Sequence, residues 1–355
     1  MKYNFGAGPC ILPQEVFQEA SQAVLNFNDT GLSILEISHR SKEFEAVMTE
    51  AEQLVRELLA VPQGYAVIFM QGGASTQFPL VPMNLLPEGG KAAYLDTGTW
   101  ASKAIKEGKK LGAVDVVASS ADANYSYVPK TYEVPSDAAY LHYTSNNTIF
   151  GTEIFETPKT SVPLVCDMSS DILSRQINVA DYGLIYAGLQ KNVGPAGAAV
   201  VIVKEELLGK TGRTLPTIFD YQSHINAGSM YHTPPVFSIY VAMLNLRWLK
   251  NKGGISVIEQ ENIIKARTLY DEIDRNPLFK GTAEKVDRSR MNVTFVMEDK
   301  AQEAAFLELA KERNLVGLKG HRSVGGFRAS IYNALGITAV NALVDTMQEF
   351  EEKNK

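Results

Sequence analysis

Seven short apolar runs recur through the first 203 positions of the chain, with helical patterns such as Trp100–Leu111 between some of them. Runs of four to six residues, bounded by glycine, proline or polar side chains, are typical of buried strands. The predicted strands are 66–70, 92–95, 114–118, 139–143, 162–166, 184–187 and 198–203. This alternation predicts an α/β fold with a large domain built on a mostly parallel seven-stranded sheet flanked by helices.

The pattern changes after Pro234-Pro235, where two long helical stretches begin. The predicted elements are helices 238–250 and 256–275, strand 293–297, helix 301–313, strands 316–319 and 327–332, and helix 338–351. They predict a smaller C-terminal α/β domain. We place a large cofactor-binding domain at residues 14–256, and assign residues 1–13 and 257–355 to the small domain.

Composition narrows the class of protein. The 355 residues are 45% hydrophobic and carry a formal net charge of −6. A sizeable core is therefore expected, and nucleic-acid or membrane binding is not. The two cysteines, Cys10 and Cys166, form no disulfide framework. No apolar run approaches membrane-spanning length, so we expect a soluble, cytoplasmic protein. We expect no metal site.

A lysine lies where charged side chains are least expected. Lys191 is in the short connection between the strands predicted at 184–187 and 198–203. Burial there would disfavour its ammonium form, so the side chain either reaches solvent or performs amine chemistry. Asp167 directly follows the strand predicted at 162–166. A lysine that forms a Schiff base, with a carboxylate that holds the proton on a pyridine nitrogen, is the pairing of a pyridoxal phosphate site.

Seven short segments carry a resemblance to a known family. They are Asn4–Pro9, Ile37–Arg40, Ala187–Asn192, Thr233–Pro235, Ser289–Val293, Lys319–Arg322 and Gly325–Ala334. In these segments the chain resembles the phosphoserine aminotransferases, which belong to class V of the fold-type I pyridoxal phosphate enzymes. The segments occur in family order and span nearly the whole chain.

The resemblance implies a transaminase that moves the amino group of L-glutamate to 3-phosphohydroxypyruvate. The products would be O-phospho-L-serine and 2-oxoglutarate, in serine biosynthesis, and a related step of vitamin B6 synthesis is a further expectation. It also implies pyridoxal 5'-phosphate as cofactor and a homodimer with shared active sites.

The same resemblance assigns cofactor contacts. They would come from Ala74, Ser75, Trp100, Thr148, Asp167, Gln190, Lys191, His232 and Thr233. Lys191 and Asp167 would be catalytic, and Trp100 would stack on the pyridine ring. Two positions depart from the family: some relatives have arginine where Ser75 stands, and most have asparagine where His232 stands. Without the resemblance, we would predict that Trp100 packs in the core and that His232 is an ordinary loop residue.

The negatively charged groups of the expected substrates require positively charged side chains to bind them. The chain offers His39, Arg40, His321, Arg322 and Arg328 near turns or strand ends. Singly, each is more simply a solvated charge or a structural ion pair. By resemblance, Arg328 would clamp the substrate α-carboxylate, because arginine can bind a carboxylate with two parallel hydrogen bonds. The other four would receive the distal phosphate or the glutamate side-chain carboxylate.

Two other functions remain open at this point. Another class V activity, such as an alanine–glyoxylate transaminase, would leave the two His-Arg pairs without an anion to bind. A catalytically idle, cofactor-binding regulator would have no need of both Lys191 and Asp167. Cysteine desulfurase activity is less favoured, because neither cysteine lies on a plausible mobile loop.

Overall fold

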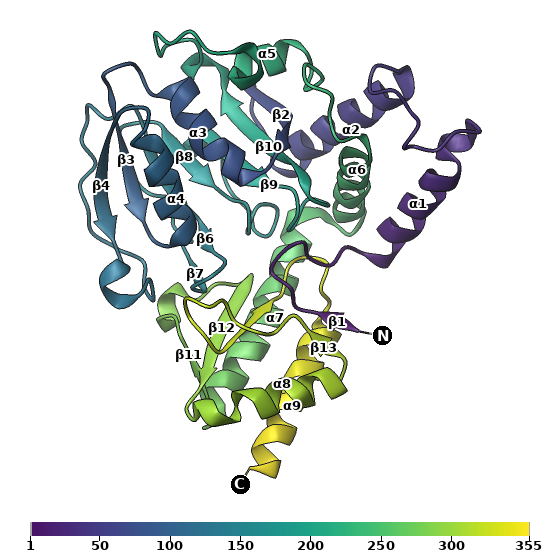
Figure 1. Cartoon of the computed structure of the whole chain (residues 1–355), viewed down its shortest axis with the longest axis vertical. Helices are drawn as coiled ribbons and strands as arrows, with labels where there is room; N and C mark the ends of the chain where they lie inside the picture. Colours follow the sequence, from purple (N-terminus) through teal and green to yellow (C-terminus); the bar gives the residue numbers. More distant parts are fainter. Residues whose placement is uncertain (1, 355) are drawn as a thin grey trace.

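A computed structural model describes residues 2–354 of the chain (Figure 1). Its helices are α1 Gln14–Leu25, α2 Lys42–Leu58, α3 Ala74–Leu85, α4 Thr99–Gly108, α5 Tyr221–Asn226, α6 Val236–Asn251, α7 Gly254–Arg275, α8 Glu303–Glu312 and α9 Ile337–Lys353. Its strands are β1 Tyr3–Asn4, β2 Tyr65–Gly72, β3 Lys91–Asp96, β4 Ala113–Ser119, β5 Leu141–Thr144, β6 Asn146–Asn147, β7 Thr152–Glu153, β8 Leu164–Asp167, β9 Leu184–Gly188, β10 Gly197–Lys204, β11 Phe279–Gly281, β12 Asn292–Met297, β13 Leu315–Val316 and β14 Phe327–Ser330.

The central sheet has seven strands in the order β2-β10-β9-β8-β5-β3-β4. Only β10 runs antiparallel to its neighbours, from Gly197 opposite Gly72 to Lys204 opposite Tyr65 on one side, and along β9 on the other. The remaining neighbours pair in parallel. All seven predicted strands overlap strands of this sheet, and the predicted fold class is confirmed.

Helices cover both faces of the sheet, as the alternation of side chains along a strand requires. In β2, Val67 and Phe69 join the core that contains residues of α1, α2 and α6. The intervening Ile68 and Met70 join the opposite core, with residues of α3 and α4. Figure 1 shows α3 and α4 in front of the sheet, with α2 and α6 beside β2 and β10.

A second unit lies below the sheet in Figure 1 and has a core of its own. It contains the three-stranded antiparallel sheet β11-β12-β14 and residues of α7, α8 and α9. The first strand also joins it, because β1 pairs in parallel with β13 and Phe5 is fully buried in this core. The division at residue 256 stays a prediction.

Some predicted boundaries differ from the structure. The strand predicted at 316–319 is reduced to β13, because Gly317 adopts a φ of +80° that breaks the extended backbone. The strand predicted at 327–332 ends at Ser330. Strands β1, β6, β7 and β11 were not predicted, since two or three residues are too short to show alternation. Among residues 2–354, no helix combines the length and apolarity needed to cross a membrane.

Candidate active site

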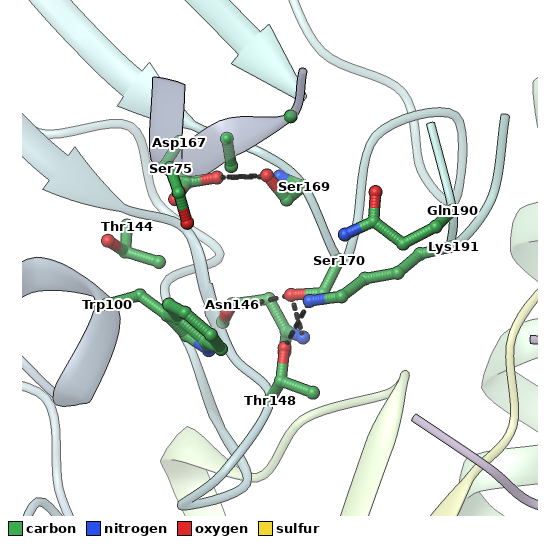
Figure 2. A pocket seen from close by; sticks show the side chains of 12 residues that line it. Ser75, Trp100, Thr144, Asn146, Thr148, Asp167, Ser169, Ser170, Gln190 and Lys191 are labelled. Atoms are coloured by element: carbon green, nitrogen blue, oxygen red, sulfur yellow. Dashed lines mark hydrogen bonds between the residues drawn. The ribbon is translucent and has the colours of Figure 1, made fainter. Parts of the chain in front are cut away.

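A cavity of about 310 Å³ opens beyond the carboxyl ends of the parallel strands (Figure 2). Its lining residues are Gly73, Ala74, Ser75, Trp100, Thr144, Asn146, Thr148, Asp167, Ser169, Ser170, Gln190 and Lys191. Thr144 and Asp167 end β5 and β8, while Gly73 directly follows β2. Parallel strands deliver their following loops to one edge of the sheet, where ligands of open α/β sheets bind.

Lys191 reaches this cavity from the loop between β9 and β10, and its side chain is buried. Its Nζ donates a hydrogen bond of 2.7 Å to the hydroxyl of Thr148. Burial lowers the pKa of Lys191 to about 8; the nearby Asp167 carboxylate opposes this shift, and Arg328 adds to it. The amine is therefore partly neutral near physiological pH, as a nucleophile or general base requires.

Asp167 is fixed in its rotamer by Ser169. Its Oδ1 accepts hydrogen bonds from the Ser169 amide at 2.9 Å and the Ser169 hydroxyl at 2.6 Å. The Ser169 hydroxyl in turn accepts one from the amide of Gly188 at 3.1 Å. Burial raises the pKa of Asp167, while the Ser169 bonds and Lys191 act in the opposite direction. The chain thus holds a buried carboxylate on the cavity wall, bound by Ser169 and also by the Tyr186 side chain.

The turn between β2 and α3 brings a helix N-terminus to the cavity. Gly72 has a φ of +104°, and a Cβ added there would lie 2.3 Å from the Thr76 hydroxyl, so the turn requires glycine. Helix α3 then begins at Ala74, after Gly73, with no side-chain cap on its first amides. Free amides and the positive end of the helix dipole favour an anion at Ala74 and Ser75.

Trp100, in the first turn of α4, lies across the cavity from Lys191 in Figure 2. Two polar atoms on this side are buried without a hydrogen-bond partner among the described residues, the indole Nε1 of Trp100 and the hydroxyl of Thr144. Buried polar groups are rarely left unpaired, so these two atoms are exceptions within the described part of the chain.

Seven of the nine predicted cofactor contacts lie together on the cavity wall, namely Ala74, Ser75, Trp100, Thr148, Asp167, Gln190 and Lys191. His232 and Thr233 do not line it. The Thr233 carbonyl accepts a hydrogen bond from the Gln71 side chain, at the end of β2, so this segment runs beside the turn that leads to α3.

The predicted substrate cations lie outside the cavity wall of this single chain. Arg328, on β14, is the nearest that hydrogen bonds identify: its guanidinium donates to the Thr148 carbonyl at 3.2 Å. Burial lowers the pKa of His321, and the positive charges of Arg328 and Arg322 lower it further. His39 and Arg40 precede α2 and have no side-chain ion pair among residues 2–354.

Five lining residues escaped prediction: Gly73, Thr144, Asn146, Ser169 and Ser170. Ser169 and Ser170 lie two and three residues after Asp167, so their proximity to the carboxylate in the sequence was a usable signal. Asn146 donates to Ser170 at 2.8 Å and to the Asn292 side chain at 2.7 Å. A contact with a residue 146 positions away in the sequence has no local signal.

A family model and curated relatives all assign the chain to the same protein family. The model of class V aminotransferases matches residues 2–343. The chain is 60% identical over 353 residues to the phosphoserine aminotransferase of Flavobacterium johnsoniae, covering 99% of each sequence. It is 57% identical over 353 residues to that of Bacteroides thetaiotaomicron, again covering 99% of each.

Solved structures agree. The phosphoserine aminotransferase of Bacillus circulans subsp. alkalophilus superposes with a TM-score of 0.97 at 46% identity, covering 100% of this chain and 99% of that one. An alanine–glyoxylate aminotransferase from Nostoc, at 16% identity and a TM-score of 0.76, shows the shared fold alone. The alternative activity is therefore not favoured, and this chain belongs to the class V aminotransferases.

Proposed function

We propose that the protein transfers the amino group of L-glutamate to 3-phosphohydroxypyruvate, giving O-phospho-L-serine and 2-oxoglutarate. One observation carries the proposal: a buried lysine amine of lowered pKa and a buried carboxylate line the same cavity. Relatives at 60% and 57% identity over nearly the full length are named for this reaction. The protein would then serve serine biosynthesis in the cytoplasm, and the corresponding phosphorylated step of vitamin B6 synthesis.

The cavity fits pyridoxal 5'-phosphate. The uncapped N-terminus of α3 at Ala74 and Ser75 would hold the phosphate, together with Gln190. Trp100, on the cavity wall, would cover one face of the ring. When bound, the cofactor supplies an aldehyde that an amine can join and a ring that accepts electrons. A solved relative from Trichomonas vaginalis, at 39% identity, is described as bound to this cofactor.

Lys191 supplies the amine and moves the proton in this proposal. Its Nζ is held at 2.7 Å from the Thr148 hydroxyl, which fixes the direction from which it approaches the cavity. With a pKa of about 8, a useful fraction of the amine is neutral at physiological pH. A neutral Nζ can accept the proton from the substrate Cα, and the resulting ammonium can return one.

Asp167 would keep a proton on the ring nitrogen. Its Oδ1 accepts two bonds from Ser169, and the Tyr186 side chain also bonds to this carboxyl group, so Oδ2 is the oxygen that we assign to the ring nitrogen. An ionised carboxylate next to a basic nitrogen favours the protonated form of that nitrogen. Ser169 therefore acts as a positioning residue that holds the carboxylate plane.

The substrate anions require cations from outside the cavity wall. Arg328, tied to Thr148, would bind the α-carboxylate, and His321 and Arg322 would face the distal anion. We propose a homodimer in which the partner completes each site with His39 and Arg40 and with His232 and Thr233. Exposed apolar side chains near those two segments, Leu32, Leu35 and Tyr231, support an interface there.

A coupled transamination assay tests the proposed function. Glutamate is the amino donor, and 3-phosphohydroxypyruvate is compared with unphosphorylated hydroxypyruvate as acceptor. We expect kcat/KM to favour the phosphorylated acid by at least about 100-fold, since losing an anion that several cations bind costs a few kcal/mol. Equal kcat/KM values for the two acids would remove the case for a phosphate site.

A further inference from the structure

Lys103 lies on α4 one helical turn after Trp100, the aromatic residue on the cavity wall. Side chains three residues apart on a helix lie on the same face. The Nζ of Lys103 is 4.4 Å from the centre of the Trp100 ring, within the range of a cation–π interaction. The ammonium group of this exposed side chain therefore lies beside the aromatic ring that lines the candidate active site.

The ammonium group of Lys103 is not paired with a carboxylate of its own helix or of the neighbouring strands. The natural partner four residues on, Glu107, is bound instead by Lys110, whose Nζ lies 2.8 Å from both carboxylate oxygens. The Asp96 carboxylate accepts hydrogen bonds from Ser102, Ser119 and Tyr125. No ion pair of Lys103 is found within residues 2–354.

Other cations approach Lys103 from the C-terminal unit. Lys103, Arg322 and Arg328 all lower the pKa of His321, in addition to the larger effect of burial. Neither arginine has an ion pair with a carboxylate in the part of the chain that the structure describes. Like charges gathered without counter-ions repel one another, and an anion bound between them offsets that repulsion. The positive charges of α4 and of segment 321–328 therefore act on the same imidazole, next to the Trp100 ring that lines the cavity.

We propose that Lys103 is a specificity-determining residue that contacts the distal phosphate of the substrate from the side of α4, opposite His321 and Arg322. The proposal rests on the proposed function, because that function supplies the phosphate. A phosphate dianion gains more than a single carboxylate from an added cation. Lys103 should therefore favour the phosphorylated acceptor over glutamate, whose distal group is a carboxylate.

The test compares Lys103→Gln with Lys106→Gln. Lys106 lies on the same helix, is also exposed and has no ion pair within residues 2–354, so it is a matched control. We expect Lys103→Gln to raise the KM for 3-phosphohydroxypyruvate about tenfold while kcat changes less than about twofold. The KM for hydroxypyruvate should change less than about twofold, and Lys106→Gln should match the wild type. Lys103→Arg, which keeps the charge, should restore most of the affinity.

A second measurement does not depend on catalysis. NMR titration of the His321 imidazole should give a higher pKa in Lys103→Gln than in the wild type, because a neighbouring positive charge has been removed. The Lys106→Gln protein should titrate as the wild type does. An unchanged His321 pKa in Lys103→Gln would show that the ammonium is not at this site, and would overturn the inference.

The two proposals fail in different ways. If the wild type uses both keto acids equally well, the proposed function fails, and the role of Lys103 fails with it. If the wild type prefers the phosphorylated acid and Lys103→Gln keeps that preference in full, only the role of Lys103 is wrong.

Discussion

Two lysines are buried among residues 2–354, and they have different surroundings. Lys191 faces the cavity and donates to a single hydroxyl, that of Thr148. Lys265, on α7, lies in the C-terminal unit and donates to the carbonyls of Ile331 and Tyr332 at 2.9 and 2.8 Å. Burial lowers the pKa of both, to about 8 for Lys191 and about 7 for Lys265.

The larger pKa shift thus belongs to the lysine without a cavity. Two backbone carbonyls occupy the Lys265 amine, which leaves it no access to a ligand. Lys191 has a nearby carboxylate, Asp167, and open space before it. Lys265 also has a carboxylate nearby, that of Glu261. A lowered pKa therefore reports burial in both places, and the cavity identifies the residue suited to chemistry.

The largest difference should appear on removing each amine in turn. Lys191→Ala should lower kcat/KM by at least about 10³-fold, since it deletes the group that moves the proton. At pH 10, where this amine is neutral in the folded chain, its removal should change the free energy of unfolding by less than about 1 kcal/mol, because little of its bonding is structural. Steady-state transamination and urea unfolding measure the two quantities. A Lys191→Ala protein with near-normal turnover would show that this lysine is not the reactive amine.

Lys265→Met should have the converse effect. It leaves the Ile331 and Tyr332 carbonyls without their donor, and a buried unsatisfied polar group costs about 1–3 kcal/mol. At pH 10, where the Lys265 amine is neutral in the folded chain and the linkage penalty has largely gone, we expect the urea midpoint to fall by a corresponding amount. The folded protein should keep its transaminase activity. Lys109→Met, at an exposed position on the other domain, is the control and should change stability by less than about 0.5 kcal/mol. Unaltered stability in Lys265→Met would mean that the two carbonyls find other partners.

Lys191 and Lys265 should also differ in the pH range over which each affects the free energy of unfolding. An unfolded lysine titrates near pH 10.4, so between pH 7 and that value the unfolded chain binds more protons at Lys265 than the folded one. The free energy of unfolding should therefore rise with pH across this window, by at most about 1.4 kcal/mol per pH unit. Lys265→Met should flatten the rise from pH 7 upward. In ligand-free protein, Lys191→Ala should flatten it only above about pH 8.

The measurement is urea unfolding at intervals between pH 6.5 and 10, with Lys109→Met as the control that keeps the full slope. If Lys265→Met retains the wild-type slope between pH 7 and 8, the buried amine does not titrate there.

The same contrast explains what the sequence predicted and what it could not. The apolar runs identified all seven strands of the central sheet. Six of them contribute buried residues to a core, whereas the edge strand β4 is apolar in sequence but has no buried residue. Lys191 and Asp167 were found because charged residues directly after such runs are conspicuous. Lys265 was missed, since its partners lie 66 and 67 residues away in the chain. Lys103 was missed because an exposed helical lysine has no local signal until the packing around Trp100 is known.

The smallest effect concerns the coupling between Lys191 and Asp167. In ligand-free protein, an amine-reactive reagent should modify Lys191 with a pH midpoint near 8, read by mass spectrometry of the labelled peptide. The negative charge of Asp167 stabilises the ammonium form, so Asp167→Asn should lower that midpoint by about one pH unit. Asp271→Asn, in an exposed ion pair with Arg267, should leave it unchanged. Lys265 should stay unlabelled in every variant, because its amine is enclosed by protein. A midpoint that rises in Asp167→Asn would mean that loss of the carboxylate opens the site to water, and that burial outweighs the charge pair.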